Sequence, residues 1–143
     1  MNNLVPDTDH ISRFCRSSSV INGRVTGAAF SLKLKDEGYL YVNWIEFLKL
    51  PDRSSQIDEI RKILKKKLHF GKDSRIAVLN VGKMKEHVSK ESFDNRKIWV
   101  EHKQQRNDPS YSGIHGLDIA NRLISELIAQ VIEKSYSATI VNP

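Results

Sequence analysis

Sixteen consecutive residues, Glu101 to Gly116 (EHKQQRNDPSYSGIHG), concentrate side chains that can move protons and hold anions. They include the imidazoles of His102 and His115 and the cations of Lys103 and Arg106, with almost no apolar residue between them. Imidazole changes charge near neutral pH, so two histidines can serve as general base and general acid. A neighbouring cation can hold a phosphate and stabilise its developing charge. This composition therefore fits metal-free cleavage of a phosphodiester.

A third histidine lies near the start of the chain, in the segment DHISRFC, where Asp9 precedes it and can orient its ring. The candidate catalytic residues are His10, His102 and His115. The candidate anion-binding residues are Arg13, Lys103 and Arg106. We expect the segment around His10 and the loop to lie beside each other at one sheet edge, with these side chains converging on one cleft. The alternative is a strand-end His102 bonded to a carbonyl, which does no chemistry.

The chain lacks the usual motifs for nucleotides and metals. Gly71-Lys72 and Gly82-Lys83 have neither the earlier glycine nor the following Ser or Thr of a phosphate-binding loop. No pair of Cys or His residues has the spacing of a zinc site. We therefore expect no metal and no cofactor.

Length and composition indicate an ordinary globular protein. The chain has 143 residues, of which 39% are hydrophobic and 28% charged, and this size can bury a core without disulfides. No apolar run is long enough for a membrane span, and the N-terminus has no signal-peptide pattern. The single cysteine, Cys15, cannot form an intrachain disulfide and fits a reducing compartment. We expect a cytoplasmic protein.

The positive charge is concentrated in the middle of the chain. The formal net charge is +6, and the segment 51–106 by itself carries +7. A basic surface attracts polyanions such as nucleic acid, although lysines also occur simply to keep a protein soluble. The candidate nucleic-acid-binding residues of this segment are Arg61, Lys62, Lys65 and Lys66, with Lys83, Lys85, Arg96 and Lys97 as a second set.

Alternating apolar and polar side chains predict strands, and apolar residues at helical spacing predict two helices. The predicted strands cover residues 28–35, 39–48, 75–81 and 97–102. The first predicted helix has Ser54 and Ser55 at its N-cap and ends near Gly71, and the second covers 118–134 after a cap at Asp118. A polar N-terminal arm (1–25) and a long polar loop (102–117) complete the chain.

These elements predict a single α+β domain over residues 1–143. We expect roughly four mainly antiparallel strands, with two main helices packed on one face. The predicted core consists of Phe30, Leu32, Leu34, Val78, Ile98 and Val100, lying under Leu123, Ile124, Leu127 and Ile128.

Several short segments resemble a family of small uncharacterised bacterial proteins. They are Asp9-His10 with Arg13 and Cys15, and residues 26–30 (TGAAF), 41–46 (YVNWIE), 77–82 (AVLNVG) and 107–110 (NDPS). The likeness spans most of the chain but brings no activity with it. It implies that the N-terminal arm and the segment after His102 are shared features, which favours a site formed by the two together.

Three functions remain open from the sequence. The first is binding of DNA or RNA through backbone contacts made by the central basic surface. The second is a histidine-based phosphodiesterase or nuclease that uses the N-terminal arm and the 101–116 loop. The third is an inhibitor-type or immunity-type protein that binds a protein partner, or dimerises, through the 118–134 helix.

Overall fold

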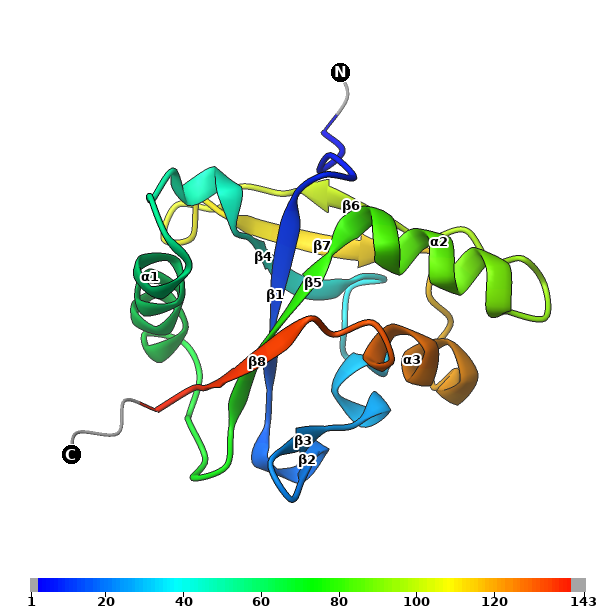
Figure 1. Cartoon of the computed structure of the whole chain (residues 1–143), viewed down its shortest axis with the longest axis horizontal. Helices are drawn as coiled ribbons and strands as arrows, with labels where there is room; N and C mark the ends of the chain where they lie inside the picture. Colours follow the sequence, from blue (N-terminus) through cyan, green and yellow to red (C-terminus); the bar gives the residue numbers. More distant parts are fainter. Residues whose placement is uncertain (1–2, 140–143) are drawn as a thin grey trace.

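The computed structural model describes residues 3–139, which form an α+β fold around a six-stranded sheet (Figure 1). The sheet strands are β1 (His10–Cys15), β4 (Leu40–Trp44), β5 (Arg75–Asn80), β6 (Trp99–His102), β7 (Tyr111–His115) and β8 (Lys134–Ser137). The helices are α1 (Arg53–Lys65), α2 (Val81–Glu91) and α3 (Arg122–Ala129), and a small ribbon pairs β2 (Val20–Ile21) with β3 (Arg24–Val25). The predicted class is confirmed, with more strands and one more helix than expected.

Every neighbouring pair in the main sheet is antiparallel, in the order β6-β7-β4-β1-β5-β8. The sheet twists strongly, so that β1 and β5 cross the direction of β6 and β7 (Figure 1). Within residues 3–139, no helix is both long and apolar enough to cross a membrane.

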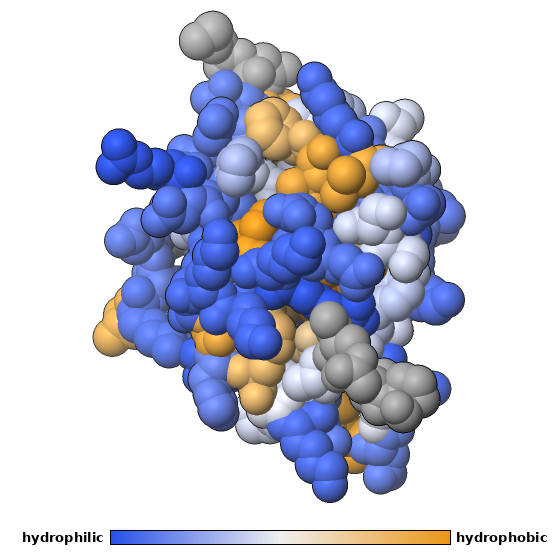
Figure 2. All heavy atoms as spheres, turned by 90° about the vertical axis from the view of Figure 1, so that its left-hand side faces the viewer, coloured by the Kyte–Doolittle hydropathy of each residue, from blue (hydrophilic) through white to orange (hydrophobic). Residues whose placement is uncertain are grey.

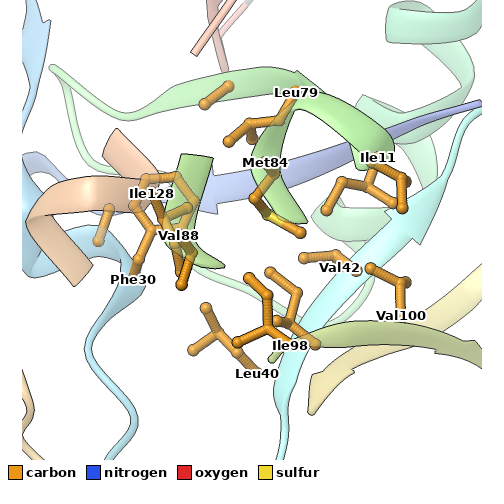
Figure 3. Close-up of a cluster of buried hydrophobic side chains, with 14 of the residues drawn as sticks. Ile11, Phe30, Leu40, Val42, Leu79, Met84, Val88, Ile98, Val100 and Ile128 are labelled. Atoms are coloured by element: carbon orange, nitrogen blue, oxygen red, sulfur yellow. The ribbon is translucent and has the colours of Figure 1, made fainter. Parts of the chain in front are cut away.

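The helices cover both sides of the sheet, whereas the sequence predicted both on one face. On β5, Ile76 and Val78 pack with α1, while the alternate residues Ala77 and Leu79 belong to the core beneath α2 and α3. A strand that is apolar on both faces needs cover on both faces, and this explains the arrangement. Figure 3 shows the larger core, where Met84 and Val88 of α2 and Ile128 of α3 lie over the strands.

The N-terminal segment differs most from its prediction as a polar arm. Residues 10–15 form β1, a central strand paired with both β4 and β5. Ile11 and Cys15 are fully buried, but the charged Arg13 between them conceals the alternation. The guanidinium of Arg13 donates to the carbonyls of Ala29 and Tyr41 at 2.8 and 2.9 Å. Backbone partners thus allow a charged residue in the middle of the sheet.

The strand predicted over 28–35 is wrong, although its first two core residues are correct. Gly27–Phe30 is a 3-10 helix, and Phe30 and Leu32 are buried. Leu34 is 83% exposed because the chain turns just there. The Asp36 carboxylate accepts the backbone N–H of Lys33 and closes that turn. Short alternation therefore identified buried side chains without identifying a strand.

The loop predicted over 102–117 contains strand β7, which lies between β6 and β4. Its middle residues Ser112 and Gly113 are buried even though neither is strongly apolar. Ladder hydrogen bonds to strands on both sides, which arise only on folding, hold this segment in the sheet.

The remaining boundaries follow local capping. The strands predicted over 39–48, 75–81 and 97–102 are found as β4, β5 and β6, but β4 ends at Trp44 and Glu46–Leu48 is a 3-10 helix. Asp52, not Ser54, caps α1, and Asn121, not Asp118, caps α3. The segment after β5 forms the additional helix α2, which Asn80 caps. The last strand of the sheet, β8, ends at Ser137.

The burial pattern of α3 yields a stability prediction. Ile128 is fully buried, while Leu123, which the sequence placed in the core, is 73% exposed. Ile128→Ala should lower the free energy of unfolding by about 2–5 kcal/mol, because it leaves a cavity. Leu123→Ala should change it by less than about 0.5 kcal/mol. Urea denaturation followed by circular dichroism measures both, and similar losses for the two variants would contradict this packing of α3.

Candidate nucleic-acid interface

His10 begins β1 with both ring nitrogens facing carboxylates. Nδ1 lies 2.6 Å from Glu46 Oε2, and Nε2 lies 3.4 Å from Glu133 Oε1. The backbone N–H of His10 also donates to Glu46, at 2.7 Å. Asp9, expected to orient the ring, instead accepts a hydrogen bond from the indole of Trp44. The imidazole of His10 therefore connects the turn after β4 to the segment before β8.

His102 ends β6 and supports the adjoining loop. Its Nε2 lies 2.7 Å from the carbonyl oxygen of Pro109, and its ring packs on Phe47 and Trp44 with centroid distances of 4.4 and 5.2 Å. This is the carbonyl-bonded alternative considered from the sequence. A ring held in this way fixes the loop against the end of the sheet.

His115 ends β7 and lies between two aromatic rings. It stacks on Trp99 at a centroid distance of 5.6 Å and lies 5.3 Å from the ring of Tyr39. Its Nε2 is 3.2 Å from a carboxylate oxygen of Glu101. Burial lowers the pKa of His115 more than the Glu101 charge raises it, so the ring is mainly neutral at pH 7.

The three imidazoles do not share one cleft. His102 pairs with Ser112 and His115 with Trp99, so the two histidines are about 10 Å apart along β7 and point to opposite faces. Two strands, β7 and β4, separate His102 from the strand that carries His10. Their catalytic role stays a prediction without a shared site.

Residues 3–5 lie against β6, but the segment around His10, expected beside the loop at one sheet edge, is the central strand β1. Val5 donates its backbone N–H to Val100, and His102 donates to the carbonyl of Asn3. The anion-binding candidates, however, are dispersed. The Arg13 guanidinium is committed to backbone carbonyls, Lys103 lies over a tyrosine ring, and Arg106 is exposed in the turn of the loop.

The first predicted set of nucleic-acid contacts lies on α1, and three of its four cations are unpaired. Arg61 is held by Asp58 at 2.6 Å and by the carbonyl of Ser137. Within residues 3–139, the side chains of the others make neither hydrogen bonds nor ion pairs; they are Lys62, Lys65 and Lys66. A surface hollow is lined by Asp58, Arg61, Lys62, Lys65, Leu68, His69, Phe70, Ala138 and Thr139. Figure 2 shows this side of the molecule as mainly hydrophilic.

The second predicted set lies around α2 and β6 and is largely neutralised. Lys85 pairs with Asp7 at 2.8 Å, and Lys83 lies 3.8 Å from Glu133. Arg96 is held by Asp118 and Asp94, whose hydrogen bonds raise its pKa. Lys83, Lys85 and Lys97 do line one hollow, but Asp7 and Glu86 line it as well. This surface has a smaller excess of positive charge than α1.

Sequence reasoning missed a second basic hollow that adjoins the first at Leu68. It is lined by Arg13, Phe14, Arg16, Ser19, Ala28, Ala29, Ser31, Lys33, Lys35, Asp36, Tyr41 and Leu68. Because Leu68 lines both hollows, their cations form one continuous surface. We call this the α1 basic surface, defined by Arg16, Lys33, Lys35, Lys62 and Lys65, together with Lys66, which lines a third hollow with Lys62 and Lys65. Three of its members come from the first 35 residues, outside the segment 51–106 on which the sequence prediction of a basic surface rested.

Sequence reasoning also missed a row of aromatic rings on one face of β4, β7 and β6. Tyr41 stacks on Tyr111 at 4.5 Å, Tyr111 meets Tyr39 edge-on at 6.2 Å, and the row continues through His115 to Trp99. The register explains why these rings share a face. Tyr111 and His115 lie an even number of residues apart on β7, so they point to the same side, and Trp99 is paired with His115. We call these five side chains the aromatic face.

A glycine and two cations complete the aromatic face. A Cβ at Gly113 would overlap the Tyr39 ring, so only glycine lets that ring lie flat on β7. Lys67 Nζ lies 4.8 Å from the centroid of Tyr41, and Lys103 Nζ lies 4.5 Å from that of Tyr39. Burial, followed by hydrogen bonds, raises the pKa of Tyr41 and of Tyr111. Their hydroxyls therefore keep their protons at neutral pH and add no negative charge.

A buried carboxylate fixes the edge of this face. Asp108 is fully buried and accepts hydrogen bonds from the Tyr41 hydroxyl at 2.5 Å and the Asn43 amide at 2.9 Å. Ser110 and Lys67 also donate to it, each at 3.0 Å. These donors come from β4, from the loop and from the turn after α1. Asp108 thus joins the end of the basic helix to the aromatic strands.

No group of three or more His, Cys, Asp or Glu side chains in the described part of the chain is arranged to hold a metal ion. Cys15, the single thiol, is buried, and burial raises its pKa to about 11. It is therefore neither ionised nor accessible at neutral pH. The unpaired cations and the aromatic face remain as the features available to a ligand.

Asp108→Asn should destabilise the protein. The Asp108 carboxylate only accepts hydrogen bonds, whereas the NH2 group of asparagine is a donor, so at least one of the donors around this position would lose its acceptor. We expect a loss of about 1–3 kcal/mol. The matched control is Asp94→Asn, in which the carboxylate belongs to an exposed ion pair, and this loss should stay below about 1 kcal/mol. Thermal and urea denaturation measure both. A smaller loss for Asp108→Asn than for Asp94→Asn would show that the buried network does not stabilise the fold.

No protein-family model, no curated protein and no solved structure matches this chain.

Proposed function

We propose that this protein binds nucleic acid through phosphate contacts made by the α1 basic surface. The observation that carries the proposal is the continuity of the two basic hollows at Leu68. Along this surface, the six defining cations make no ion pair with any carboxylate of residues 3–139. Unpaired cations retain counterions that phosphates can displace, and this release drives binding.

Asp58 and Asp36, the carboxylates that line the two hollows, are already engaged, and one further carboxylate, Glu59, lies beside Lys62, Lys65 and Lys66. Asp58 pairs with Arg61, and Asp36 accepts the backbone N–H of Lys33. Their charges are thus partly compensated within the protein, while the lysine side chains point their charge into solvent. An excess of cations along one surface supports binding of a polyanion rather than of a neutral ligand.

The histidine-based phosphodiesterase draws less support. His10 has the best-oriented imidazole, but both of its ring nitrogens face carboxylates, which would repel a phosphate. His102 is bonded to a carbonyl, and His115 is enclosed between aromatic rings. Binding without cleavage is therefore our proposal.

Replacing three lysines of the surface tests the proposal. In the variant Lys62→Gln, Lys65→Gln, Lys66→Gln, affinity for a short labelled RNA or DNA should fall. The slope of log affinity against log salt should decrease by about 2–3, since each lost phosphate contact removes about 0.7–0.9. Fluorescence anisotropy between about 50 and 200 mM salt gives this slope.

The control variant removes the same charge elsewhere, through Lys83→Gln, Lys90→Gln and Lys97→Gln around α2 and β6. It should leave most of the slope intact. Equal effects of the two triple variants would locate no interface on α1 and would indicate a response to net charge alone. Absence of binding by the wild-type protein at about 50 mM salt would refute the proposed function.

A further inference from the structure

The half of the sheet made by β4, β7 and β6 has two faces of different character. One face carries Leu40, Val42, Val100 and Ile114, all buried in the core beneath α2 and α3. On the other face the apolar residues of α1 form a core cluster with Ile76 and Val78 of β5, and of the aromatic face Tyr41 packs against that cluster. The aromatic face is consequently only partly covered, and Trp99 is 37% exposed.

Aromatic rings on a partly open sheet face form a surface suited to flat ligands. The rings of the aromatic face contact one another in sequence from Tyr41 to Trp99, which fixes their orientation before any ligand arrives. Unpaired nucleobases stack on such rings, and antiparallel sheets that bind single strands use this contact. Paired bases in a duplex have no free ring surface to offer.

Charge favours a nucleotide over an uncharged flat ligand. Lys103 lies over the Tyr39 ring, where its ammonium group can reach the phosphates of a nucleic-acid strand whose bases stack beside it. Lys67 lies over Tyr41 and Tyr111, but its ammonium is bonded to Asp108. Glu101 also lies on this face, but its carboxylate accepts from the Trp99 indole and lies against His115. Its charge is thus turned toward the protein.

The aromatic face is also continuous with the proposed phosphate-binding surface. Tyr41 belongs to the ring row and lines the second basic hollow. Lys67 follows the C-terminal end of α1 and reaches the same ring. A single-stranded nucleic acid whose phosphates lie on the α1 basic surface can therefore place its bases on the rings of β4 and β7.

We infer that the aromatic face binds unpaired bases, so that the substrate class of the proposed function is single-stranded nucleic acid. The inference rests on that function, because the rings alone do not supply affinity for phosphate. Trp99, at the exposed end of the row, and Tyr39, beneath the flexible Lys103, are the stacking positions. A base that stacks on Tyr39 displaces the Lys103 ammonium from the ring toward a phosphate.

The test compares single strands with a duplex. The probes are fluorescein-labelled oligo(U) and oligo(dT) of about 12 nucleotides and a hairpin duplex of the same sequence class. The variants Trp99→Leu and Tyr39→Leu keep an apolar side chain but remove the ring. The control is Tyr136→Leu, because Tyr136 on β8 also carries a lysine over its ring, Lys134 at 5.2 Å, but lies on the opposite edge strand.

We expect each aromatic variant to bind single strands about tenfold more weakly, with duplex affinity and the affinities of Tyr136→Leu unchanged. Tryptophan fluorescence gives a second readout, since the chain has two tryptophans, Trp44 and Trp99. Oligonucleotide should quench wild-type emission, and this quenching should be lost in Trp99→Leu if the protein still binds through its lysines.

The outcomes separate the inference from the function on which it rests. Equal affinity for duplex and single strands, with no effect of Trp99→Leu or Tyr39→Leu, would overturn the base-stacking face and leave phosphate binding by α1 intact. A wild-type protein that binds none of the probes would overturn both.

Discussion

The arrangement of the aromatic face depends on the buried carboxylate of Asp108. It accepts hydrogen bonds from two side chains of β4, from Ser110 before β7 and from Lys67 after α1. A buried charge is tolerated only when donors surround it, so the segments that supply those donors are held together. The basic helix, the loop and the aromatic strands are thereby placed side by side, although they are distant in the sequence.

In the proposed binding mode, two kinds of interaction meet at this junction and contribute differently to recognition. The α1 basic surface attracts any polyanion, and its contribution weakens as salt screens the charges. The aromatic face contributes stacking, which salt affects little and which distinguishes unpaired bases from paired ones. Lys67 lies between the two, because it follows the C-terminal end of α1, bonds to Asp108 and lies over Tyr41 and Tyr111. The proposed binding mode therefore couples an unspecific attraction to a selective contact.

The histidines show why residue types alone are a weak guide to chemistry. All three are polar, near cations and adjacent to a carboxylate or loop, as an acid–base site requires. In the structure, His10 joins two carboxylates, His102 holds Pro109, and His115 fills a place in a row of rings. Each imidazole thus has a local structural role, and none is placed to hand a proton to another.

The sequence by itself determined the features that depend on local periodicity and composition. These are the α+β class, the helix after residue 52, the strands β4 to β6, and the lysines of α1, because amphipathic spacing and charge are properties of neighbouring residues. Tertiary structure decided the rest. β1 and β7 are strands because pairing on both sides satisfies their backbone groups, in spite of Arg13 in one and Gly113 in the other. The aromatic face and the second basic hollow exist only because that pairing brings together Tyr39, Tyr111 and Trp99, and places Arg16 and Lys33 beside Leu68. Contacts between residues far apart in the chain produce no hydrophobic periodicity, so they cannot be predicted from local sequence patterns.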